Sequence, residues 1–184
     1  MILSDIDIKQ YVKKYNMIEP FDDTRLIKLE KKISWGVSSY GYDLRVSDEF
    51  LVPQEDKDIV VDPKNFDINK FKKIKSQTYT IPPNNFVLTK SLEYFRIPRD
   101  VLVVVFGKST YARCGLIVNI TPLEPEWEGY ITISIINPLN HKITIYANEG
   151  IAQAVFLKAD QLCEISYKDK QGKYQAQKDI TLPK

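Results

Sequence analysis

The sequence predicts an all-β protein that begins with one short helix. Many short runs of apolar, mostly β-branched residues are separated by proline, glycine and asparagine. Only one segment, near the start of the chain, has the apolar spacing of a helix. The 184 residues, of which 43% are hydrophobic, suit a single folded domain with a sizeable core. Together these features are typical of a β-sandwich, jelly roll or barrel.

The helix is expected to start after Ser4. Ser4 and Asp7 have the spacing of a capping box, in which each side chain bonds the other residue's backbone N–H. Apolar and aromatic side chains then recur at helical spacing, at Ile8, Tyr11, Val12 and Tyr15. We expect the helix to end near Asn16, ahead of Pro20.

The rest of the chain reads as strands and turns. The expected strands are 51–52, 59–61, 78–81, 85–88, 101–106, 116–120, 130–136, 143–146 and 151–157. The continuous apolar run 101–106 predicts a strand buried on both faces. The lysine-rich segment 70–75 is expected to be a solvated surface loop.

Composition excludes several classes of partner. The formal net charge is only +2, which argues against broad electrostatic binding of nucleic acid or of a membrane surface. The N-terminus lacks the basic start and apolar run of a secretory signal. No stretch is long enough to span a bilayer. We therefore expect a cytoplasmic protein with no nucleic-acid or membrane partner.

Cysteine and histidine are too scarce for most metal sites. Cys114 and Cys163 lie far apart and are expected to be reduced and mostly buried. His141 is the only histidine, which argues against a His/Cys zinc site and against a triad with a histidine base. The H-x-E and P-C-x-x-C motifs of zinc nucleobase deaminases are missing. Any deamination by this chain would therefore proceed without zinc.

A glycine-headed segment, Gly107–Gly115, follows the apolar run 101–106 directly. The hydroxyls of Ser109 and Thr110 and the amides beside them can donate to phosphate oxygens. Lys108 and Arg113 add positive charge, and arginine can hold a phosphate with two hydrogen bonds. This is not a Walker A loop, so an ordinary charged turn remains an alternative to a phosphate site.

An acidic segment, Thr121–Gly129, lies between two expected strands. It holds three carboxylates, Glu124, Glu126 and Glu128. One of them could serve as a general base or contact a ribose and magnesium. A solvated acidic turn is the alternative.

The strand expected at 130–136 alternates in polarity with a period of two. Ile131, Ile133 and Ile135 share one face and should enter the core. Tyr130, Thr132 and Ser134 share the other face, which must meet solvent or line a pocket. The tail, 167–184, is polar and carries five lysines. It is either a disordered end or a segment that orders over a ligand.

Five blocks of this sequence resemble bacterial dCTP deaminases. They are Ser38–Arg45, Gly107–Gly115, Leu123–Gly129, Tyr146–Gln153 and Gly172–Gln177. The resemblance covers nearly the whole chain in the same order. It implies a distorted jelly roll of the dUTPase type, assembled as a homotrimer with active sites between subunits. Residues 1–184 would form one domain, whose segment 167–184 closes over the nucleotide.

The resemblance also implies an activity. dCTP and water would give dUTP and ammonia without zinc, with Mg²⁺ bound through the triphosphate. The dUTP would supply dUMP and dTTP synthesis, and dTTP is a further candidate ligand. The phosphates and the catalytic water are assigned to Lys108, Ser109, Thr110 and Arg113, with Ser109 and Arg113 in catalytic positions. The remaining implied site residues are Tyr111, Ala112, Glu124, Thr132, Ile133, Ser134, Gln153, Tyr167, Lys173 and Gln177.

One departure from the family pattern concerns the chemistry itself. The family's catalytic glutamate falls at Ser134, because this chain has Thr132-Ile133-Ser134 where the family has Thr-Leu-Glu or Thr-Ile-Glu. A serine hydroxyl is not a base at neutral pH without a partner. Two alternatives therefore remain beside a dCTP deaminase of impaired activity. One is a dUTP diphosphatase or bifunctional enzyme using Glu124, and the other is a nucleotide-binding protein without catalysis.

Overall fold

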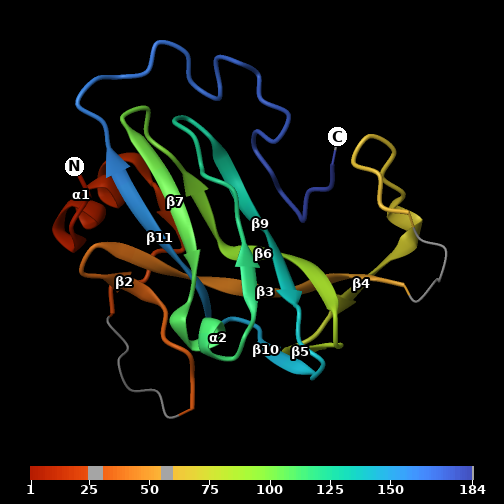
Figure 1. The fold of residues 1–184 in the computed structure, drawn as a ribbon. Helices are drawn as coiled ribbons and strands as arrows, with labels where there is room; N and C mark the ends of the chain where they lie inside the picture. Colours follow the sequence, from red (N-terminus) through yellow and green to blue (C-terminus); the bar gives the residue numbers. More distant parts are fainter. Residues whose placement is uncertain (25–30, 55–59, 184) are drawn as a thin grey trace.

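A computed structural model of the protein describes residues 1–24, 31–54 and 60–183 (Figure 1). The helical elements are α1 (Asp5–Tyr15), η1 (Ile68–Lys70) and α2 (Ser109–Arg113). The strands are β1 (Ile18–Glu19), β2 (Gly36–Ser38), β3 (Gly41–Pro53), β4 (Phe71–Lys75), β5 (Thr78–Ile81), β6 (Asn85–Arg96), β7 (Val101–Gly107), β8 (Ile117–Asn119), β9 (Glu128–Asn137), β10 (Ile143–Tyr146) and β11 (Gly150–Lys158). The mostly-β prediction with a short N-terminal helix is confirmed. In this part of the chain, no helix is both long and apolar enough to cross a membrane.

Helix α1 forms where the capping box predicted it. The Ser4 Oγ accepts the Asp7 N–H, and the Asp7 carboxylate accepts the Ser4 N–H at 3.0 Å. The helix ends at Asn16, which is left-handed at φ 54° and donates its N–H to the Val12 carbonyl. Ile8 is fully buried beneath the helix.

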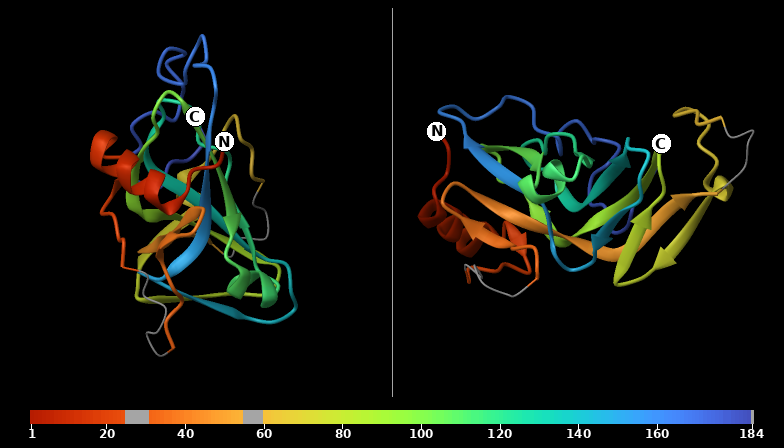
Figure 2. Two further views of the ribbon diagram at one scale, coloured as in Figure 1. Left: turned by 90° about the vertical axis from the view of Figure 1, so that its left-hand side faces the viewer. Right: turned by 60° about the horizontal axis from the view of Figure 1, so that its bottom comes forward.

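Among the described residues, nine strands form one strongly curved sheet, and β5 pairs with β10 in a second sheet. The path through the large sheet is β7-β11-β3-β6-β9-β8, while β1 joins β6 and both β2 and β4 join β3. The curvature brings β7 and β8, the two ends of this path, close together. A Cβ built on Gly107 of β7 would lie only 3.2 Å from the Val118 Cβ of β8. The result is the barrel-like shape expected of a jelly roll (Figure 2).

The core follows the period-two pattern of the strands. Ile131, Ile133 and Ile135 of β9 are at most 2% exposed, as predicted, while Thr132 and Ser134 face the other way and are half-buried. β7 corrects the prediction of a strand buried on both faces, because Leu102 and Phe106 are 36% and 59% exposed. The core covers only one face of this strand, the face that carries the buried Val101, Val103 and Val105.

Three further predictions are wrong. Val60 and Val61 belong to no strand and are exposed, while Ile59 lies outside the described residues. The lysine-rich segment 70–75 forms the end of η1 and strand β4, because its backbone pairs with β3 while Lys72, Lys73 and Lys75 stay exposed. Both cysteines are free, but Cys114 is exposed and Cys163 only half-buried, because each lies in a connection outside the sheet.

Candidate functional site

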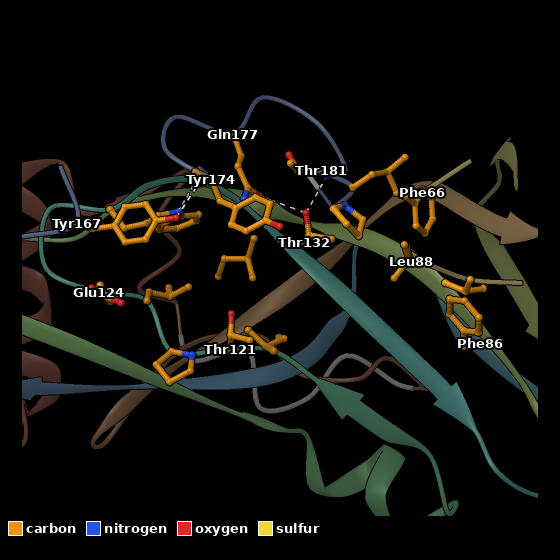
Figure 3. Close-up of a pocket in the computed structure, with 18 residues that line it drawn as sticks. Phe66, Phe86, Leu88, Thr121, Glu124, Thr132, Tyr167, Tyr174, Gln177 and Thr181 are labelled. Carbon is orange, nitrogen blue, oxygen red and sulfur yellow. Dashed lines mark hydrogen bonds between the residues drawn. The ribbon is translucent and has the colours of Figure 1, made fainter. Parts of the chain in front are cut away.

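A cavity of about 580 Å³ opens between β6, β9, the acidic segment and the tail (Figure 3). Its walls are mainly apolar, which is usual for a ligand site of this size. The described residues that line it are Val61, Phe66, Phe86, Leu88, Ile120, Thr121, Pro122, Leu123, Glu124, Trp127, Ile131, Thr132, Tyr167, Tyr174, Gln177, Thr181, Leu182 and Pro183. Of the residues predicted from the sequence, this cavity gathers Glu124, Thr132, Tyr167 and Gln177.

The three carboxylates of the acidic segment have different surroundings. Glu124 lines the cavity, and its Oε2 lies 3.3 Å from the Lys170 Nζ. Glu126 and Glu128 line a separate hollow instead, and Glu126 pairs with Arg99 at 2.6 Å. Among the described residues, Glu124 is therefore the only carboxylate that lines the cavity.

The tail forms one wall of this cavity. Its backbone lies across β9, where the Tyr130 N–H donates to the Gln177 carbonyl at 2.9 Å. The Trp127 indole donates to the Tyr174 carbonyl at 2.8 Å, and the Tyr174 N–H donates to the Tyr167 hydroxyl at 3.0 Å. The tail is therefore packed against β9 and lines the cavity, while its closing over a ligand stays a prediction.

Gly129 allows the tail to approach so closely. Its φ is +148°, a backbone conformation that residues other than glycine rarely adopt. A Cβ there would lie 2.7 Å from the Gln177 backbone nitrogen. The glycine at the second position of β9 thus leaves room for the tail.

The segment Gly107–Gly115 forms a second cluster around the short helix α2. The Lys108 Nζ lies 2.5 Å from the Asp43 carboxylate, and both side chains are largely buried. Ser109, Thr110 and Arg113 are exposed on the helix. Figure 1 draws α2 and the tail at opposite ends of β9, and none of the described residues lining the cavity comes from α2. Within one chain, the predicted site residues thus fall into two separate groups.

The other predicted residues are placed as follows. Gln153 lies on β11 beside the α2 end of the sheet and donates to the Ser38 Oγ at 3.1 Å. Tyr111 is buried, and burial raises the pKa of its hydroxyl to about 12, so it stays neutral while accepting the Tyr146 N–H. Ile133 is fully buried, so only its backbone could reach a ligand. Ala112 and Lys173 are exposed.

Ser134 lines a neighbouring hollow of about 400 Å³ rather than the main cavity. Its other described lining residues are Asn84, Asn85, Phe86, Ile136, Asn137 and Pro138. Phe86 also lines the main cavity, so the two spaces adjoin. No carboxylate is among these described residues, so Ser134 has no acidic neighbour that could act as its partner in the hollow.

Sequence reasoning missed the charged residues that hold the tail. Asp179 meets Lys73 and Lys90, which come from β4 and β6. The spacing of these lysines and of this aspartate in the sequence does not indicate that they meet. Only the folded arrangement brings them together.

A buried ion pair supports the sheet behind the site. The Glu93 carboxylate is completely buried and accepts the Arg45 Nε at 2.7 Å and the Arg45 backbone N–H at 2.9 Å. Burial raises the pKa of Glu93, and the Arg45 charge opposes that rise. This pair joins β3 to β6, the strand that carries Phe86, Leu88 and Lys90.

Residues 2–159 match the protein family described as dCTP deaminase-like. A dCTP deaminase of Nautilia profundicola is 58% identical over 184 residues, which are 100% of this chain and 97% of the relative. A dCTP deaminase of Ectopseudomonas mendocina is 54% identical over 185 residues, covering 100% of this chain and 98% of the relative.

The solved structure of 2'-deoxycytidine 5'-triphosphate deaminase from Agrobacterium tumefaciens superposes with a TM-score of 0.63 at 14% identity. The match covers 84% of this chain and 47% of that one, so this chain corresponds to about half of the longer protein. At this identity the likeness supports the fold.

Proposed function

The chain belongs to the dCTP deaminase-like family, and from this premise we propose that it deaminates dCTP to dUTP, releasing ammonia without zinc. The observation that carries the proposal is the 58% identity to a dCTP deaminase over the whole chain. That match includes α2, the cavity and the tail together. The dUTP formed would supply dUMP and dTTP synthesis.

In the proposed reaction, the cavity residues would bind the base and the sugar, and the α2 segment would bind the triphosphate. The apolar cavity suits the pyrimidine ring, and Glu124 and the Thr132 hydroxyl suit the sugar and the polar edge of the base. The α2 segment suits the triphosphate, because it combines exposed hydroxyls with Arg113. Magnesium would travel with the triphosphate, since no group of three or more metal-ligating side chains occurs among the described residues.

Because α2 does not line the cavity of its own chain, we propose that the site is completed by a second copy in a homotrimer. Exposed apolar residues support this arrangement. Leu102, Phe106 and Ile117 lie on β7 and β8, the strands that flank α2, and are 36%, 59% and 50% exposed. Such a patch on a small protein is typical of an interface between subunits.

Ser134 favours a second candidate, a protein that binds the nucleotide with little or no turnover. Water must lose a proton as it attacks C4 of the cytosine ring, and the departing amine must gain one. The hollow beside Ser134 offers no carboxylate for these transfers among its described residues. Glu124 lines the main cavity and could act as the base for a different reaction, the cleavage of dUTP to dUMP and pyrophosphate. This cleavage is therefore a third outcome to measure.

We expect the purified protein, incubated with dCTP and Mg²⁺, to release ammonia and dUTP in equal amounts. Ammonia, dUTP, dUMP and pyrophosphate are followed together, with dCMP as the control substrate that lacks the β- and γ-phosphates. Tight dCTP binding without any product would instead establish the silent binder. Pyrophosphate formed from dUTP would establish the diphosphatase. If calorimetry detects no binding of any deoxypyrimidine triphosphate, the proposal is wrong.

An Arg113→Ala variant tests both the phosphate role and the shared site. Loss of a bidentate, charged contact costs about 1.5–3 kcal/mol, so dCTP should bind about 10- to 100-fold more weakly. A Glu124→Ala variant should also bind weakly, through the other group of residues. Mixed oligomers of the two variants should regain part of the wild-type binding sites, because one wild-type α2 would then meet one wild-type cavity. Absence of any recovery, in oligomers shown to contain both chains, would contradict sites between subunits.

A further inference from the structure

Asp179 of the tail lies between two lysines of the sheet. Its Oδ2 is 2.9 Å from the Lys73 Nζ of β4, and its Oδ1 is 3.0 Å from the Lys90 Nζ of β6. Oδ1 also accepts the Ile180 N–H at 2.8 Å, which fixes the orientation of the carboxylate. A single tail side chain thus contacts two strands.

Glu49 of β3 contacts the same two lysines as Asp179. Its Oε2 lies 2.8 Å from the Lys90 Nζ and 3.2 Å from the Lys73 Nζ, so the four charges alternate in sign. Hydrogen bonds from the two lysines lower the pKa of Asp179 despite its partial burial. The bond to Lys90 is the main cause of a lowered pKa at Glu49. All four groups are therefore charged at neutral pH.

The four charges are linked to the cavity by a short chain of hydrogen bonds. The Asp179 carbonyl accepts the Thr181 hydroxyl at 3.0 Å, and the Thr181 N–H donates to the Thr132 Oγ1 at 2.9 Å. The Thr132 hydroxyl in turn donates to Gln177 at 3.2 Å. Holding Asp179 therefore fixes Gln177 and Thr181, both of which line the cavity (Figure 3).

Little apolar burial holds this part of the tail. Not one of residues 168–183 is fully buried. A segment that docks by hydrogen bonds and half-exposed charges opens more readily than the core. The charges thus add to the hydrogen bonds that dock this part of the tail, and salt can weaken their contribution.

We propose that Asp179, Lys73, Lys90 and Glu49 form a latch that holds residues 177–183 in place as a wall of the cavity before any nucleotide binds. Lys73, Lys90 and Asp179 would then be positioning residues. They act on the ligand only through Gln177, Thr181 and the residues that follow. The role in substrate binding rests on the proposed function, whereas the latch itself does not.

The latch makes a definite prediction for the kinetics. If the closed tail is the state that binds, the apparent affinity scales with the fraction of closed molecules. Weakening the latch should therefore raise KM for dCTP and leave kcat at saturation nearly unchanged. A defect of the chemistry would lower kcat instead.

The test compares Lys73→Gln with Lys75→Gln in the full-length protein. Lys75 lies on the same strand but pairs with Asp48, outside the latch. Without nucleotide, amide hydrogen exchange is followed in the peptide that contains Thr181. We expect about two- to five-fold faster exchange in Lys73→Gln, as for the loss of one partly exposed ion pair, and wild-type exchange in Lys75→Gln. Lys73→Arg, which keeps the charge, should restore slow exchange.

Salt and substrate provide the remaining outcomes. Raising the NaCl concentration should speed exchange in the wild type and have a smaller effect in Lys73→Gln. Equal exchange in Lys73→Gln and Lys75→Gln would overturn the latch. Faster exchange with an unchanged KM for dCTP would overturn its positioning role. If dCTP does not bind at all, the proposed function fails, while the exchange result still decides whether the latch exists.

Discussion

A Ser134→Glu variant should turn over dCTP about 10²- to 10⁴-fold faster than the wild type, the usual contribution of a general acid–base group. Residue 134 lies on the same face of β9 as Thr132, and the hollow that it lines adjoins the main cavity through Phe86. A glutamate there is longer than serine by a carboxylate and one methylene. It would place a proton acceptor beside a space that has no carboxylate among its described lining residues. The measurement is the initial rate of ammonia release at saturating dCTP.

Ser134→Gln is the matched control, because it has the same length and polarity but cannot accept a proton from water. We expect Ser134→Gln to remain as slow as the wild type. If Ser134→Glu binds dCTP but is no faster than Ser134→Gln, then the missing base has been assigned to the wrong position. A wild-type rate that already matches that of active relatives would mean that another group supplies the proton transfers, and Glu124→Gln would then test the acid of the cavity.

An Arg45→Met variant should lose about 3–5 kcal/mol of folding stability, the usual cost of leaving one member of a buried ion pair alone. Glu93 is completely buried, and the Arg45 Nε is its closest cationic partner at 2.7 Å. Methionine keeps much of the arginine volume, so the charge is the main change. The measurement is the denaturant midpoint at a fixed protein concentration, because assembly would add its own stabilisation.

The pH dependence of this loss has a definite sign. Without Arg45, the pKa of Glu93 in the folded protein should rise further above its ordinary value of 4.5. A group whose pKa is raised in the folded state stabilises the fold below its unfolded pKa and loses that contribution as pH rises. The deficit of Arg45→Met should therefore be largest at neutral pH and shrink toward pH 4.5.

The control for this variant is Arg96→Met, which breaks an exposed pair with Glu19 at 2.8 Å. An exposed pair contributes at most about 1 kcal/mol. Equal losses in the two variants would show that the burial of Glu93 is not the cause.

The sequence by itself determined the local elements of this protein. The capping box at Ser4 fixed the start of α1, and the alternation of isoleucines fixed which face of β9 enters the core. Both are decided by residues close together in the chain. Local patterns failed for β4, which forms because it pairs with β3, and for β7, whose outer face is exposed because the core covers only its inner face.

Only the tertiary structure decided how the candidate site is divided. The acidic pattern alone did not distinguish Glu124 from Glu126 and Glu128, whereas the family resemblance pointed to Glu124. The fold placed only Glu124 of these three in the lining of the cavity. It also separated α2 from that cavity and brought Asp179 to Lys73 and Lys90, across long stretches of the chain. Contacts of this kind depend on how the sheet curves and where the tail crosses it. Those features arise from packing of the whole domain and leave no periodic signal in the sequence.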